Sequence, residues 1–148
     1  MAIRPAAAED VEAVETVVRD AYAPYVPRIG REPAPMRADY AALVDRELVW
    51  VAAAAHGVLG VLVVRPGDES VLLENVAVAP AWQGKGIGRA LIRFAEERAR
   101  ALGAMEITLY TNELMTENLR LYPALGYEET GRHDEEGFRR VFFRKALG

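Results

Sequence analysis

A glycine-rich turn, Gln83-Gly84-Lys85-Gly86-Ile87-Gly88, has the residue types and spacing that most clearly suggest chemistry in this chain. A helix is predicted to begin here, and the first amides of a helix lack intrahelical partners while its dipole adds partial positive charge. Because glycine carries no Cβ, an anion can approach the backbone closely, and Lys85 and Arg89 add mobile positive charge. The turn therefore predicts a site for a phosphate-bearing ligand.

The charge around the turn supports this prediction. Between residues 80 and 103 five basic side chains face two acidic ones, a balance of +3 in a chain whose net charge is −4. Two other phosphate loops do not fit: the mononucleotide P-loop needs four residues between its glycines and a following Lys-Ser/Thr, and the dinucleotide fingerprint needs G-x-G-x-x-G. Taken alone, the turn fits a tight structural connection nearly as well as an anion site.

The elements on either side of the turn must hold it in place. Residues 72–80 (LLENVAVAP) are dense in Val and Leu, and predict a strand that ends at its proline. After the turn, apolar residues recur at helical spacing from Ile87 to Leu102, and Gly103 is the expected C-terminal glycine. This pattern puts Glu96 on the polar face of the helix.

The whole chain, residues 1–148, is predicted to form one domain of α/β (α+β) class. We expect strands at 3–4, 48–55, 58–65, 72–80, 105–111, 127–133 and 138–145, and helices at 6–21, 37–44, 87–102 and 117–125. The order β-α-α-β-β-β-α-β-α-β-β predicts a mixed sheet with helices on both faces.

Composition excludes several classes of protein. There is no cysteine, so disulfides and cysteine nucleophiles are excluded, and two well-separated histidines make no zinc site. The net negative charge argues against general affinity for nucleic acid. The first residues show no secretory signal, and His56-Gly57 interrupts the apolar stretch 48–64, which two buried strands explain better than a membrane span. We therefore expect a cytoplasmic protein.

The element order, with Gln83-x-x-Gly86-x-Gly88 opening the long helix, resembles the GNAT acyltransferase superfamily over essentially the whole chain. A second signature of that family, Leu-Tyr followed by Gly and an aromatic residue, is present as Leu121-Tyr122 and Gly126-Tyr127. Each motif alone is weak, but both occur at the expected separation and on the expected elements. The resemblance implies the GNAT fold, with a mostly antiparallel central sheet, and an enzyme that uses acetyl-CoA to acetylate an amine by direct attack.

The resemblance also implies where the cofactor binds. Backbone amides of residues 84–89 would hold the pyrophosphate, the pantetheine arm would follow the strand edge where the fourth and fifth strands splay apart, and the Val76 amide would donate to the thioester oxygen. An asparagine common in the family is replaced here by Met115, for which Asn118 or Asn112 could substitute. The expected cofactor-binding residues are Val76, Ala77, Val78, Gln83, Gly84, Lys85, Gly86, Ile87, Gly88, Arg89 and Asn118.

Two residues are predicted to act as the acid and the base of the reaction. Tyr122 matches the family's tyrosine and is expected to be the acid for the leaving thiolate; the alternative is a tyrosine that only packs. Glu74 is expected to be the base, directly or through water, because a carboxylate in an apolar strand must be paired or reach water. Simple alternation puts Glu74, Val76 and Val78 on one side of the strand. The alternative is a solvated or salt-bridged carboxylate in a strand whose irregularity alters the alternation.

The front half of the chain is expected to recognise the acceptor, a primary amine of a small molecule or peptide. The expected substrate-binding residues are Tyr22, Tyr25, Arg28, Met36 and Tyr40. Arg28 and Arg31 could bind a carboxylate or phosphate of the acceptor, although such arginines more often only shape a loop. A sensor or regulatory module that binds acyl-CoA without turnover is the alternative to an enzyme. Exposed sheet edges are compatible with a homodimer, and no metal, membrane or nucleic acid is expected as a partner.

Overall fold

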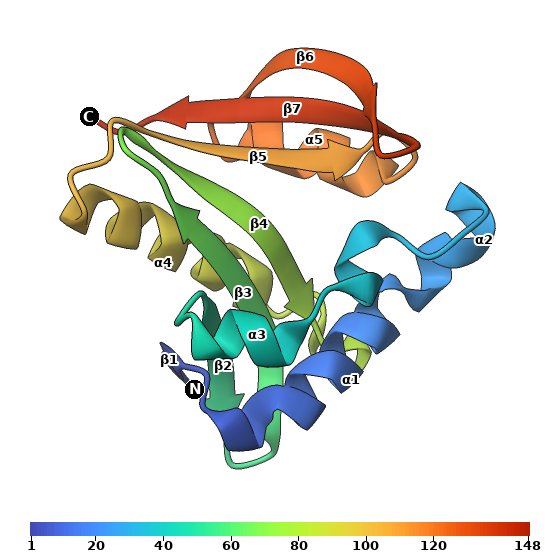
Figure 1. The fold of residues 1–148 in the computed structure, drawn as a ribbon, viewed down its shortest axis with the longest axis vertical. Coiled ribbons are helices and arrows are strands. Elements are labelled where there is room, and N and C mark those ends of the chain that lie inside the picture. Colours follow the sequence, from blue (N-terminus) through green and yellow to red (C-terminus); the bar gives the residue numbers. More distant parts are fainter.

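The computed structural model describes residues 1–148, which form a single seven-stranded sheet with helices around it (Figure 1). The strands are β1 (Ala2–Pro5), β2 (Val49–Ala54), β3 (Gly57–Pro66), β4 (Ser70–Val78), β5 (Glu106–Asn112), β6 (Glu128–Glu135) and β7 (Phe138–Ala146). The α-helices are α1 (Val11–Tyr22), α2 (Val26–Ile29), α3 (Tyr40–Asp45), α4 (Ile87–Ala101) and α5 (Thr116–Ala124). The strand order is β1-β2-β3-β4-β5-β7-β6, and only the β4–β5 pair is parallel.

Local sequence patterns predict most of these elements. All seven predicted strands are present, and α4 begins at Ile87 as expected. The first helix begins later than predicted because a 3₁₀ turn at Ala8–Asp10 precedes it, where the Asp10 carboxylate accepts a 2.8 Å hydrogen bond from the Ala7 amide. The proline-rich segment contains the single-turn helix α2, which ends at Gly30 in the left-handed conformation (φ 91°). No helix is both long enough and apolar enough to cross a membrane.

Two hydrophobic clusters cover the two faces of the sheet. On one face α4 contributes Leu91 and Ala95, both fully buried, and on the other α1 contributes Val14 and Val18. Figure 1 shows α1 and α3 in front of the sheet and α4 behind it, so the prediction of helices on both faces is confirmed.

Glu96 does not lie on the polar face of α4, as helical periodicity predicts, but is buried. Its carboxylate accepts hydrogen bonds from the Tyr127 hydroxyl at 2.8 Å and from Lys145 Nζ at 3.0 Å. A buried carboxylate needs such partners. These bonds join α4 to the C-terminal hairpin, which explains why the position tolerates a charge.

Strands β4 and β5 are paired at one end only. Their register runs from Ser70–Leu73 against Glu106–Leu109 and stops there, and Figure 1 shows the two strands diverging toward α2. A β-bulge marks this point: Val63 of β3 pairs with Asn75 and Val64 with Leu73, so Glu74 between them has no partner. Because a bulge bends its strand, it opens a gap between the two halves of the sheet.

Candidate active site

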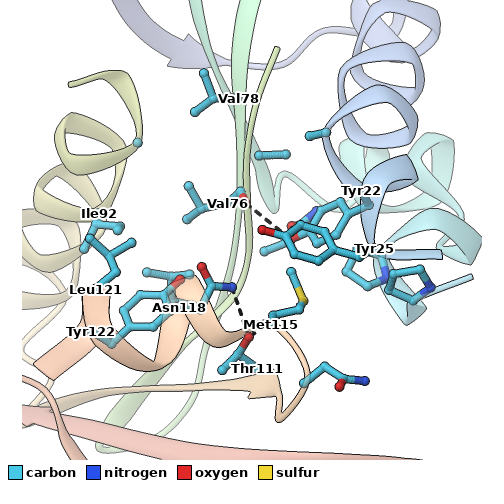
Figure 2. A pocket seen from close by; sticks show the side chains of 18 of the residues that line it. Tyr22, Tyr25, Val76, Val78, Ile92, Thr111, Met115, Asn118, Leu121 and Tyr122 are labelled. Atoms are coloured by element: carbon cyan, nitrogen blue, oxygen red, sulfur yellow. Dashed lines mark hydrogen bonds between the residues drawn. The ribbon is translucent and has the colours of Figure 1, made fainter. Parts of the chain in front are cut away.

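The gap between β4 and β5 opens into a cavity of about 450 Å³ that reaches from α4 on one face of the sheet to α1 on the other. Figure 2 shows Ile92 and Tyr122 on one side of β4, with Tyr22 and Tyr25 on the other. The predicted site residues that line this cavity are Tyr22, Tyr25, Glu74, Val76, Ala77, Val78, Gln83, Gly84, Gly86, Ile87, Gly88, Arg89, Asn118 and Tyr122. Residues 48 positions apart, such as Glu74 and Tyr122, therefore share one site.

The glycine-rich turn presents unused backbone amides at the mouth of this cavity. No hydrogen bond within the chain uses the amides of residues 84–89, and the first bond at this end of α4 runs from the Ala90 amide to the Gly86 carbonyl at 3.0 Å. Gly84 and Gly86 are left-handed (φ 78° and 86°), and a Cβ at either would meet no atom within 4 Å. The turn is therefore open to an anion, and its free donors suit a diphosphate.

The free edge of β4 supplies further donors and acceptors. The Ala79 amide bonds to Leu59 of β3, and in an antiparallel ladder alternate residues turn their polar groups to the same neighbour. Val76 and Val78 therefore turn theirs toward the gap, where β5 no longer pairs with them. In agreement, the Val78 carbonyl accepts a 3.0 Å bond from the Gln83 side chain, and the Val76 carbonyl lies 3.3 Å from the Tyr22 hydroxyl.

Tyr122 on α5 combines a buried ring with a hydroxyl that faces the cavity (Figure 2). The ring packs edge-on against Tyr127, with centroids 5.6 Å apart, and lies 5.9 Å from Phe143. Its hydroxyl makes no hydrogen bond within the chain, and no fully buried side-chain nitrogen or oxygen is left without a partner. Burial raises the pKa of Tyr122 to about 12. The phenol is therefore a protonated donor at neutral pH with nothing else to bind.

The start of α5 carries the position where the family's asparagine is missing. Met115 is buried and lines the cavity, and Asn118 lies beside it (Figure 2). The Asn118 side-chain nitrogen donates to the Thr111 hydroxyl at 3.0 Å, which fixes the amide with its oxygen unused. Asn118 is thus placed at the cavity as an acceptor for a ligand amide.

Glu74 reaches the cavity, but the strand alternation used to predict its direction is wrong. Leu73 and Val76 both pack against the cluster that contains α4, which unbroken alternation forbids, because the bulge at Glu74 resets the alternation. The Glu74 carboxylate accepts a hydrogen bond from Arg65 Nε, and its side chain is 21% exposed. Glu74 is therefore a paired carboxylate that also contacts the cavity.

The predicted acceptor residues divide into two sets. Tyr22 and Tyr25 line the cavity, whereas Arg28, Met36 and Tyr40 do not. Tyr40 is buried, and its hydroxyl donates to the Pro35 carbonyl at 2.6 Å. Met36 is only partly buried, in a 3₁₀ turn.

Arg28 does not line the cavity but connects the segment after α1 to α5. It donates to Glu117 at 2.8 Å, and the same carboxylate accepts from the Tyr25 hydroxyl at 2.7 Å. Lys85, predicted to bind cofactor, is fully exposed at the turn and does not line the cavity either.

Among the cavity residues that the sequence did not predict, Asn75 and Arg140 are buried and polar. Asn75 is buried, accepts a hydrogen bond from the Tyr22 hydroxyl and donates to the Tyr40 hydroxyl at 3.0 Å. A buried amide in an apolar strand needs hydrogen-bond partners, so the position of Asn75 in the sequence could have marked it as a site residue. Arg140 has a side chain only 6% exposed, with its guanidinium 4.3 Å above the Tyr110 ring. No local pattern in strand β7 distinguishes Arg140 from its neighbours.

The splayed sheet and the open glycine-rich turn together fit the class of acyltransferases that the sequence resembles. The chain belongs to the GNAT acetyltransferase family, because residues 45–129 match the family model of the acetyltransferase (GNAT) domain. This confirms the expected family and the expected GNAT fold. 

Curated relatives and solved structures agree with this assignment. N-acetyltransferase family 8 member 3 of Rattus norvegicus is 32% identical over 88 residues, which cover 55% of this chain and 39% of that protein. N-acetyltransferase 8B of Homo sapiens is 32% identical over 89 residues, 56% of this chain and 39% of that protein. The matched part of the chain therefore spans about two fifths of these relatives.

Two solved structures share the fold over nearly the whole chain. The PaiA N-acetyltransferase of Thermoplasma acidophilum in complex with coenzyme A has a TM-score of 0.83 at 21% identity, covering 98% of both chains. The ribosomal-protein-S18-alanine N-acetyltransferase of Escherichia coli has a TM-score of 0.80 at 17% identity, covering 99% of this chain and 93% of that one. At these identities the likeness concerns the fold alone.

Proposed function

We propose that this enzyme transfers the acetyl group of acetyl-CoA to a primary amine of a small molecule or peptide by direct attack. The observation that carries the proposal is the continuous path from the free amides of residues 84–89, along the open edge of β4, to the Tyr122 hydroxyl. The Thermoplasma acidophilum relative, whose fold matches this chain over nearly its whole length, is a complex with coenzyme A, which supports a coenzyme A ligand for this fold.

The residues along the path fit the parts of acetyl-CoA in order. The amides of the turn, with Arg89 beside them, would hold the pyrophosphate. The outward-facing peptide groups of Val76 and Val78 would bind the pantetheine amides, with Asn118 as a further acceptor. The Val76 amide would then donate to the thioester oxygen, where negative charge develops during attack. Acetyl-CoA supplies the activated acetyl group.

The protein's contribution to the chemistry is proton handling at the two ends of the reaction. The amine nitrogen forms a bond to the acetyl carbon as the carbon–sulfur bond breaks, so the amine loses a proton and the sulfur gains negative charge. Glu74, directly or through water, is proposed to take that proton. Tyr122 is proposed to donate to the sulfur, since its hydroxyl is protonated and free of other partners.

Acetyl-CoA binding and turnover test the proposal separately. Calorimetry should detect one site per chain, and an amine panel should release free thiol from acetyl-CoA. Arg89→Ala should weaken acetyl-CoA binding roughly 10- to 150-fold, the cost of a hydrogen bond to a charged group. Arg93→Ala, one turn further along α4 and outside the cavity, is the matched control and should bind normally.

The outcomes separate the enzyme from the alternative. Binding without thiol release from any amine would support an acyl-CoA sensor instead of an enzyme. Equal loss of affinity in both arginine variants would remove the turn from the proposed binding site. A protein that shows neither binding nor thermal stabilisation by acetyl-CoA would refute the proposed function as a whole.

A further inference from the structure

The end of the cavity beyond β4 is built from aromatic rings and prolines. Its lining residues come from the end of α1, from the segment that follows it and from strands β5 and β7. They include Tyr22, Tyr25, Pro33, Pro35, Tyr110 and Phe138. Figure 2 shows the Tyr22 and Tyr25 rings together on the α1 side of the strand, away from Ile92 of α4. In the proposed function this end receives the acceptor, because the donor path occupies the α4 side.

The polar atoms of these tyrosines are used by the protein. The Tyr22 hydroxyl donates to Asn75, and the Tyr25 hydroxyl donates to Glu117 at 2.7 Å. A hydroxyl that already donates to a carboxylate or amide has no proton left for a ligand. Tyr22 and Tyr25 therefore offer the cavity their ring surfaces, which is unfavourable for a sugar or peptide that needs many hydrogen bonds.

Charged groups at this end are few and already paired. Glu74 pairs with Arg65, and Arg140 pairs with Glu135 while its guanidinium covers one face of the Tyr110 ring at 4.3 Å. A second ammonium on an acceptor would have to approach Arg140 without a free carboxylate to receive it. The site thus disfavours polyamines and favours a ligand with a single amine.

The two walls of this end are tied to each other across the cavity. The Arg31 guanidinium lies 3.8 Å above the Phe138 ring and donates to the Glu136 carbonyl at 2.8 Å. Arg28 and Tyr25 are bonded to Glu117 of α5. Contacts of this kind hold the two walls together, and the aromatic rings that line them suit a flat ring, which can stack on them or meet them edge-on.

From these contacts we propose that the acceptor is an arylalkylamine: a single primary amine joined by a short linker to a flat, apolar ring. The ring lies among Tyr25, Pro33 and Phe138, and the amine points through the gap toward Glu74 and the Val76 amide. This proposal rests on the proposed acetyl transfer and adds the chemical class of the acceptor. The reaction transfers one acetyl group to nitrogen and releases one thiol, so no further reactant is needed.

The experiment compares kcat/KM for 2-phenylethylamine, ethylamine, spermidine, glucosamine and an alanine tripeptide by thiol release. Burying one aromatic ring predicts that 2-phenylethylamine exceeds ethylamine by about 10- to 150-fold. It should also exceed spermidine, glucosamine and the tripeptide. A ratio near one to ethylamine, or a higher value for any of the other three, overturns the proposal while leaving acetyl transfer intact.

Two variants of one residue test the wall directly. Tyr25→Ala removes the ring and should lower the 2-phenylethylamine to ethylamine ratio about 2- to 12-fold, the loss of one aromatic contact. Tyr25→Phe keeps the ring, loses the bond to Glu117 and should keep the ratio. If both variants leave the ratio unchanged, the ring of the acceptor does not lie there and the proposal fails. Acetyl-CoA binding with no turnover of any amine also overturns it, whereas absence of acetyl-CoA binding is failure of the proposed function itself.

Discussion

Replacing Tyr122 with Phe isolates the contribution of one oxygen atom to the proposed reaction. The ring contacts with Tyr127 and Phe143 do not involve that oxygen, and the hydroxyl has no partner in the chain. Tyr122→Phe therefore breaks no internal hydrogen bond, and the free energy of unfolding should change by less than about 1 kcal/mol. Any larger effect on turnover then reports on the chemistry.

The magnitude follows from the acidity of the buried phenol. Burial raises the pKa of Tyr122 to about 12, whereas a free thiol has a pKa of about 8.5. Complete proton transfer to a free thiolate is therefore uphill by about 3.5 pKa units, or about 5 kcal/mol. A hydrogen bond to the sulfur as it gains charge is the favourable role, worth about 1.5–3 kcal/mol. That corresponds to roughly 10- to 150-fold in kcat, below the upper range of a full general acid, about 10²–10⁴-fold.

Thiol release at saturating acetyl-CoA measures this loss, and calorimetry measures acetyl-CoA affinity in parallel. We expect kcat of Tyr122→Phe to fall within the range above while the dissociation constant stays within about twofold, because the lost contact forms mainly in the transition state. An unchanged kcat refutes the role of Tyr122. A loss of affinity with kcat unchanged at saturating acetyl-CoA shows instead that the hydroxyl binds the donor equally well in the ground state and the transition state.

Three further predictions concern carboxylates. Glu74→Gln should lower the rate most toward low pH, where the acceptor amine is protonated; a pH–rate profile identical to wild type excludes Glu74 as the base. Hydrogen bonds from Tyr25, and then from Arg28, lower the pKa of Glu117 from its ordinary value of 4.5 to about 2, so the stabilisation from these bonds is present above about pH 4.5 and is lost as pH falls toward 2. Glu117→Gln should reduce the dependence of the unfolding midpoint on pH between about pH 2 and 4.5. An unaltered dependence contradicts the stabilising role of the bonds from Tyr25 and Arg28. Glu96→Ala should lower the free energy of unfolding, measured in urea, by about 2–3 kcal/mol. This is less than the loss expected for a fully buried ion pair, because the Lys145 side chain is 26% exposed. The control is Glu97→Ala, which changes an exposed residue, and equal stability of the two variants argues against the buried bonds of Glu96.

Local patterns predict the elements of this fold because periodicity, proline and glycine act within a few residues. The start of α4 after Gly86 and the end of β4 before Pro80 follow from such signals. Two errors arise where a distant partner decides. Glu96 is buried because Lys145, 49 positions later, reaches it. The direction of Glu74 depends on the register between β3 and β4, which no single-strand pattern contains.

The two ends of the site also differ in whether neighbouring or distant residues of the sequence form them. The proposed donor end consists of unused backbone amides from consecutive residues, 84–89, so a short motif is enough to predict it. The acceptor end depends on pairs that are far apart in sequence: Tyr22 with Asn75 at 53 positions, Tyr25 with Glu117 at 92, and Arg31 with residue 136 at 105. Only the folded chain shows that these bonds use the protons of the tyrosine hydroxyls, which is the basis for the proposed acceptor.

The bulge at Glu74 connects both ends of the site to one structural cause. It bends β4 away from β5, which frees the peptide groups of Val76 and Val78 for the donor. It also precedes Asn75, whose side chain bonds to Tyr22 in the acceptor wall and to the buried Tyr40. A shift of this strand by one residue would therefore displace the donor edge and the acceptor wall together. In the proposed function, the donor and the acceptor would meet at this same irregularity, because the cavity that lies between them opens at the gap in the sheet.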